Sequence, residues 1–87
     1  MANQEIENIR KQIDELDKKI VELLNERAHL SLKVNEFKLQ ENLPLYDPAR
    51  EEEILDEVSK LSNSTLPADY VKKIYNVILD CMKDVVK

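Results

Sequence analysis

Three basic residues, Arg10, Arg27 and Lys38, have types and spacings suited to holding an anion. Arg27 stands in a series of apolar residues, at a position where an aliphatic side chain is expected. A buried guanidinium without a counter-charge costs several kcal/mol, so it requires an anionic ligand or an internal acid. Glu26 and Glu51 could supply the internal acid, in which case the charges would only fix the register of a helical assembly.

Glu51 is the acid whose position suggests a role in a site. It follows Asp47 and Pro48, which are typical of a helix N-cap and first helical residue. At 100° per residue, Glu51 lies about 20° from Val58 around the helix axis, whereas the next two glutamates lie roughly 120–140° away. We therefore predict that Glu51 faces inward. The alternative is that it only favours the positive end of the helix dipole.

The composition indicates one small all-α domain that spans residues 1–87. The chain has no glycine, which excludes glycine-rich phosphate loops and dinucleotide fingerprints. A net charge of −5 argues against nucleic acid as a partner. With one cysteine and one histidine, we expect no disulfide and no metal site. We expect His29 on the surface and Cys81 as a reduced thiol in the core.

No signal peptide and no apolar run of membrane-spanning length stand out in the sequence. We therefore expect a cytoplasmic protein that does not interact with a membrane.

Three helices are predicted. The first runs from about Asn3 to about Gln40, the second from about Pro48 to Leu61, and the third from about Pro67 to the end of the chain. The first carries an apolar seam at alternating spacings of three and four, made of Ile6, Ile9, Ile13, Leu16, Ile20, Leu23, Leu30, Val34 and Phe37, and interrupted by Arg27. In the third, one face is expected to consist of Val71, Ile74, Ile78, Cys81, Met82 and Val85.

The long first helix predicts an intertwined helical homodimer. It would be roughly 55 Å long, and two helices of about 20 to 30 Å cannot cover its seam. A second copy is the simplest cover. If two first helices run antiparallel, Arg10 of one chain lies opposite the space between Arg27 and Lys38 of the other. Three cations from two chains then converge twice in the dimer, which favours an anionic ligand over an internal ion-pair network.

Two stretches of the sequence resemble a known family. "IRKQIDELDKKIVELLNERAHLSLKVNEFK" followed by "LPLYDPAREEEIL" is similar to the AroQ-type, all-helical chorismate mutases. The resemblance covers essentially the whole chain. It implies an isomerase that converts chorismate to prephenate for phenylalanine and tyrosine synthesis, without a cofactor, in a dimer whose active sites are shared between chains.

The resemblance also implies roles for the three cations. Arg10 matches an arginine that reaches into the partner's active site to bind a substrate carboxylate, and Arg27 matches the second carboxylate-binding arginine. Lys38 matches the lysine that contacts a carboxylate and the ether oxygen. These three are the expected catalytic residues.

The second helix is expected to complete the substrate-binding set. Asp47 matches a loop aspartate at the edge of the site, and Arg50 matches an arginine that lines it. Glu51 matches the glutamate that binds the ring hydroxyl of the substrate, which would explain why it faces inward.

The third helix departs from the family pattern. Val86 stands where the family places a glutamine or glutamate that hydrogen-bonds the ether oxygen, and Met82 replaces a small polar residue one turn earlier. By analogy with the loss of one oxyanion donor, this departure could cost on the order of 10²–10³ in rate. Either Lys38 then acts alone on the ether oxygen, or Lys87 substitutes for the missing donor. Two alternatives therefore stay open: an isochorismate pyruvate-lyase-like relative, and a catalytically weak binding or regulatory helical dimer of an aromatic-pathway enzyme.

Overall fold

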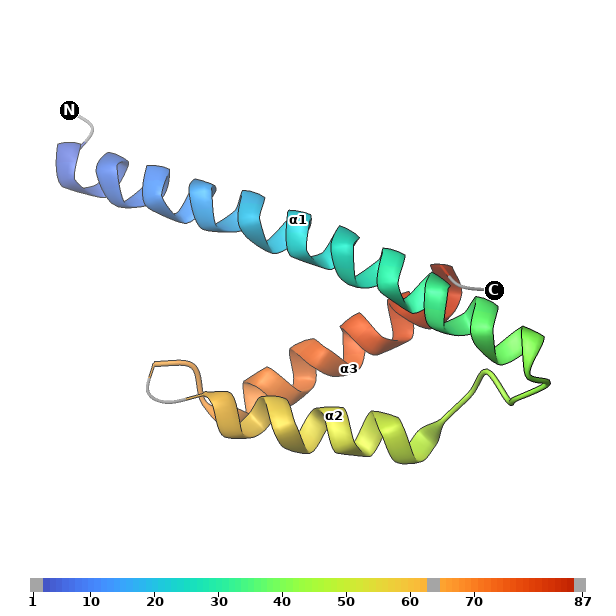
Figure 1. The fold of residues 1–87 in the computed structure, drawn as a ribbon. Helices are drawn as coiled ribbons and strands as arrows, with labels where there is room; N and C mark the ends of the chain where they lie inside the picture. Colours follow the sequence, from blue (N-terminus) through green and yellow to red (C-terminus); the bar gives the residue numbers. More distant parts are fainter. Residues whose placement is uncertain (1–2, 63–64, 86–87) are drawn as a thin grey trace.

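In the part of the chain that the structure describes, three helices follow one another (Figure 1). The computed structural model describes residues 3–62 and 65–85, and within these ranges it contains no strand. Helix α1 spans Gln4–Gln40, α2 spans Pro48–Leu61 and α3 spans Ala68–Val85. The all-α prediction is confirmed, and the predicted helix bounds are correct to within one residue wherever the structure describes them.

Helix α1 begins and ends with caps encoded in the local sequence. The side chain of Asn3 accepts hydrogen bonds from the backbone N–H groups of Glu5 and Ile6, at 2.9 and 3.4 Å. At the other end, Asn42 adopts φ of 58°, and two reverse hydrogen bonds close the helix, from Leu43 N to Lys38 O and from Asn42 N to Leu39 O. This is a Schellman ending, with asparagine at the left-handed position that glycine usually takes.

The connection from α1 to α2 ends at an aspartate cap. Asp47 accepts a hydrogen bond from the backbone N–H of Arg50 at 3.0 Å, and Pro48 is the first residue of α2. Proline lacks the N–H that would be unsatisfied in the first turn, so the pair fixes where the helix begins. The cap also places Arg50 and Glu51 in the first turn of α2.

The second and third helices form a hairpin that meets the end of α1. Helix α2 packs along α3, while α1 contacts only α3 among the helices described. In Figure 1 the hairpin lies near the C-terminal part of α1, and the N-terminal half of α1 extends away from it. The chain has a longest dimension of 61 Å and a radius of gyration of 16.9 Å. A compact domain of this length would have a radius of gyration of about 12 Å.

Very little of a single chain is buried. Leu79 of α3 is the buried hydrophobic residue of the part described, with 6% of its surface exposed. The residues of the apolar seam on α1 each remain 47–65% exposed, as measured for Ile6, Ile9, Ile13, Leu16, Ile20, Leu23, Leu30, Val34 and Phe37. Helices α2 and α3 of the same chain therefore leave the seam uncovered, as we predicted from the lengths of the three helices.

The predicted packing face of α3 is partly wrong. Leu79 is buried and Tyr75 half-buried, whereas Ile74, Cys81 and Val85 are exposed. Cys81 lies two residues, or about 200°, beyond Leu79 around the helix, so it points away from the hairpin. The prediction of a core thiol is therefore wrong for this chain.

Candidate functional site

A pocket of about 660 Å³ opens where the C-terminal part of α1, the start of α2 and the end of α3 meet. It is lined by residues of all three helices and of the connection before α2: Arg27, Leu30, Ser31, Val34, Asn35, Lys38, Leu45, Tyr46, Asp47, Arg50, Glu51, Ile54, Leu79, Met82 and Lys83. Five of the six residues that the sequence analysis selected line this one pocket. Apolar side chains form part of its wall, which suits a small ring-containing ligand with charged substituents.

Arg27 and Lys38 bring positive charge to the pocket from α1. They are 11 residues apart, about 16 Å along the helix, and both side chains are half-buried. Lys38 Nζ donates a hydrogen bond to the backbone carbonyl of Leu45 at 3.3 Å, which ties the end of α1 to the connection before α2. In the part of the chain that the structure describes, neither Arg27 nor Lys38 forms an ion pair with a carboxylate.

The first turn of α2 presents Glu51 to the pocket, while Glu52 and Glu53 point outward. Glu51 is half-buried, with 23% of its side chain exposed, whereas Glu52 and Glu53 are exposed. The orientation predicted from helical spacing is therefore confirmed. Arg50 lines the pocket too, but its guanidinium pairs with Glu53 on the outer side of the same helix.

Lys83 of α3 also lines the pocket, and the sequence analysis did not select it. Its Nζ lies 2.9 Å from Oε1 of Glu51 and 5.1 Å from the centre of the Tyr46 ring. The hydrogen bond to Glu51 raises the pKa of Lys83 above its ordinary value of 10.5, against an opposing effect of desolvation. Lys83 therefore carries its charge at neutral pH.

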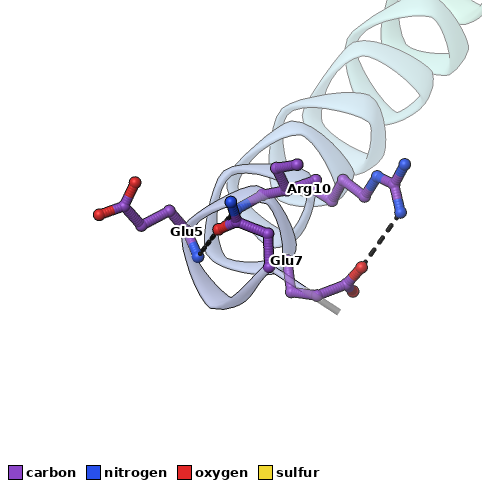
Figure 2. Close-up of polar contacts among 5 residues, drawn as sticks. Glu5, Glu7 and Arg10 are labelled. Atoms are coloured by element: carbon purple, nitrogen blue, oxygen red, sulfur yellow. Dashed lines mark hydrogen bonds and ion pairs between the residues drawn. The ribbon is translucent and has the colours of Figure 1, made fainter. Parts of the chain in front are cut away.

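Arg10 is not part of this pocket within one chain. It lies 17 residues before Arg27, about 25 Å along α1, on the segment that extends beyond the hairpin. Figure 2 shows its guanidinium paired with Glu7 one turn earlier, at 3.1 Å, and the Arg10 side chain is 68% exposed. Any role for Arg10 in such a pocket requires a second chain.

The remaining expectations concern single residues, metal binding and membrane spanning. Met82 lines the pocket, but Val86 and Lys87 lie outside the described residues. His29 is exposed, in agreement with the prediction. No group of three or more metal-binding side chains occurs among the residues described, and none of the described helices is long and apolar enough to cross a membrane.

Comparison with known proteins agrees with this architecture. Residues 9–87 match the family described as chorismate mutase type II. A chorismate mutase of Methanocaldococcus jannaschii is 36% identical over an alignment of 78 positions that covers 88% of this chain and 79% of that protein. A bifunctional chorismate mutase/prephenate dehydratase of Aquifex aeolicus is 36% identical over 80 residues, covering 87% of this chain but only 22% of the relative.

The fold is also shared with a solved structure that holds a ligand. The crystal structure of a chorismate mutase from Helicobacter pylori in complex with prephenate superposes with a TM-score of 0.87 at 28% sequence identity. The alignment covers 97% of this chain and 91% of that one.

Proposed function

The chain belongs to the type II chorismate mutase family, and from that premise we propose that it converts chorismate to prephenate. The observation that carries the proposal is the pocket itself. It places Arg27 and Lys38, two half-buried cations without a carboxylate partner in the described chain, beside the inward-facing acid Glu51. This arrangement suits a ring that bears carboxylates and a hydroxyl group.

The proposed reaction needs few chemical groups from the protein. Conversion of chorismate to prephenate is a unimolecular rearrangement in which one carbon–oxygen bond breaks as a carbon–carbon bond forms. No nucleophile, metal or redox group takes part. The protein must hold a flexible dianion in its folded, reactive conformer and place positive charge where the ether oxygen becomes negative.

The lining residues can be assigned to these tasks. Arg27 would bind one carboxylate through its planar fork of N–H donors. Lys38 would approach a carboxylate and the ether oxygen, and Glu51 would accept a hydrogen bond from the ring hydroxyl. Asp47 and Arg50 would close the edge of the pocket at the start of α2.

Two further features belong to the proposal. The exposed seam of α1 supports a homodimer, in which Arg10 of one chain would bind the second carboxylate in the partner's pocket. We also place the protein in the cytoplasm, a reducing compartment in which the exposed thiol of Cys81 would stay unoxidised.

The experiment that tests this function measures chorismate consumption by the purified protein, with identification of the product. We expect prephenate as the product. Lys38→Ala should lower kcat by about 10²–10³, because Lys38 is the cation assigned to the ether oxygen.

Lys60→Ala is the matched control. Lys60 is an exposed lysine of α2 that pairs with Asp56 at 3.0 Å and does not line the pocket, so its variant should retain full activity. A folded protein that neither binds nor consumes chorismate would refute the proposed function. Release of pyruvate in place of prephenate would indicate lyase chemistry.

A further inference from the structure

Lys83 and Glu51 form an ion pair that connects two helices at the pocket. The pairs Arg10–Glu7, Lys18–Glu15 and Lys60–Asp56 join residues three or four positions apart on one helix. The Lys83–Glu51 pair instead links the last turn of α3 to the first turn of α2, at 2.9 Å. Both of its side chains line the pocket.

The ammonium group of Lys83 is held from several directions. Besides Glu51, it lies 3.6 Å from Oδ1 of Asp80 and 5.1 Å from the centre of the Tyr46 ring. Asp80 precedes Lys83 on the same helix, and Tyr46 belongs to the connection before α2. An aromatic ring at this distance attracts a cation through its quadrupole. Three segments of the fold thus define where the ammonium sits, and the ammonium in turn defines where one oxygen of Glu51 sits.

The pair leaves Glu51 able to accept a further hydrogen bond. An ionised carboxylate has two oxygens and about four acceptor positions, and Lys83 uses one oxygen. We propose that Lys83 is a positioning residue that holds the carboxylate of Glu51 in place to receive the ring hydroxyl of the ligand. This inference rests on the proposed function, because it takes Glu51 as the hydroxyl acceptor.

A general charge effect is the competing explanation. With Lys83, the pocket lining contains four basic residues, Arg27, Lys38, Arg50 and Lys83, against the two acids Asp47 and Glu51. Removal of one positive charge would lower the pocket's affinity for every dianion, whether or not the dianion carries a hydroxyl. Positioning of Glu51 affects only ligands that have the hydroxyl. The two explanations therefore predict different results for two ligands.

The test compares chorismate with an analogue in which hydrogen replaces the ring hydroxyl while both carboxylates remain. In Lys83→Met, we expect KM for chorismate to rise about fivefold, the scale of a partly exposed ion pair, with kcat nearly unchanged. The hydroxyl contact exists in the bound substrate as well as in the transition state, so its loss acts on KM. The inhibition constant of the analogue should not change.

Three further variants complete the design. Lys83→Arg keeps a positive donor and should restore most of the affinity, and Lys60→Met removes the cation of an ion pair away from the pocket and should change nothing. In a Glu51→Gln background, Lys83→Met should add little to the loss of chorismate affinity that Glu51→Gln itself causes. A residue that acts through Glu51 has no separate effect once Glu51 is replaced. Circular dichroism and sedimentation confirm that each variant folds and assembles.

Two results would overturn the inference. An equal loss of affinity for chorismate and for the analogue in Lys83→Met would mean that Lys83 acts only through its positive charge. Unchanged kinetics in Lys83→Met would mean that the pair has no role in binding. Either result leaves wild-type conversion of chorismate intact. Failure of the proposed function is distinguishable, because the wild-type protein itself would then be inactive.

Discussion

At the scale of single residues, Arg27 and Lys38 differ from the other basic residues of the described chain because they are half-buried and form no ion pair. Arg10, Arg50 and Lys83 each pair with a nearby glutamate. The chain has 18 acidic residues and a net charge of −5, so partners are abundant, yet none forms an ion pair with Arg27 or Lys38 in the described structure. Two half-buried cations left in this state are stabilised when an anion enters the pocket.

Val86 provides a prediction at the same scale. The family resemblance predicts that its position matches the one where the family carries a donor to the ether oxygen, and in the sequence it follows the pocket residue Met82 by four positions. We expect Val86→Gln to raise kcat for chorismate, by a factor approaching 10². The effect should fall on kcat because the ether oxygen gains negative charge mainly in the transition state.

Val86→Leu is the control for packing at the end of the chain and should give no comparable increase. Steady-state kinetics of both variants decide the matter. If kcat of Val86→Gln equals that of the wild-type protein, the donor position of the family does not correspond to residue 86.

At the scale of elements, the end of α1 depends on Asn42. Its positive φ is unfavourable for most residues and most unfavourable for β-branched ones, while glycine adopts it freely. We therefore expect Asn42→Val to lower the free energy of unfolding by about 1–2 kcal/mol. Asn42→Gly should keep or slightly raise it. Urea denaturation at one fixed protein concentration gives the comparison.

Asn76 supplies the control for this prediction. It is an exposed asparagine within α3, where φ is helical, so Asn76→Val should change stability by no more than about 0.5 kcal/mol. Equal destabilisation by both valine variants would contradict the role assigned to the backbone conformation of Asn42.

Local chemistry explains why the helices could be predicted so closely. Asp47 and Pro48 determine where α2 starts, and the spacing from Glu51 to Val58 determines which glutamate faces the pocket. These effects act within one or two turns, so they can be read from neighbouring residues. The same holds for Arg27 and Glu51 as candidates, because each stands out against the pattern of its own helix.

Contacts between helices could not be predicted in the same way. Helix α3 is apolar on more than one side, so spacing did not distinguish the buried Leu79 from the exposed Cys81. Lys83 looked like an ordinary polar residue of the last turn. Its partner Glu51 lies 32 positions earlier, and only the packing of α2 against α3 brings the two together.

At the scale of the whole molecule, the single chain has an unfinished core. The chain is extended, with a radius of gyration of 16.9 Å, and its 37-residue first helix exposes an apolar seam. Exposure of this apolar surface to water is unfavourable for an isolated chain. A second chain placed antiparallel about the midpoint of α1, at residue 22, would cover both seams. It would also bring the exposed Arg10 opposite residue 34 or so, between Arg27 and Lys38 of its partner.

This arrangement predicts that two inactive variants restore activity when mixed. Arg10→Ala should inactivate the partner's pocket, and Arg27→Ala should inactivate the pocket of its own chain. In a heterodimer of the two, one pocket contains both defects and the other contains neither. When the two chains unfold and refold together, about half of the dimers should be heterodimers, each with one intact pocket out of two. The mixture should therefore recover about a quarter of wild-type activity.

Sedimentation equilibrium should show dimers throughout, and affinity tags on the two variants allow the heterodimer to be isolated and assayed. An isolated heterodimer without activity would mean that each pocket takes all its residues from one chain, and a folded monomer at micromolar concentration would rule out the dimer altogether.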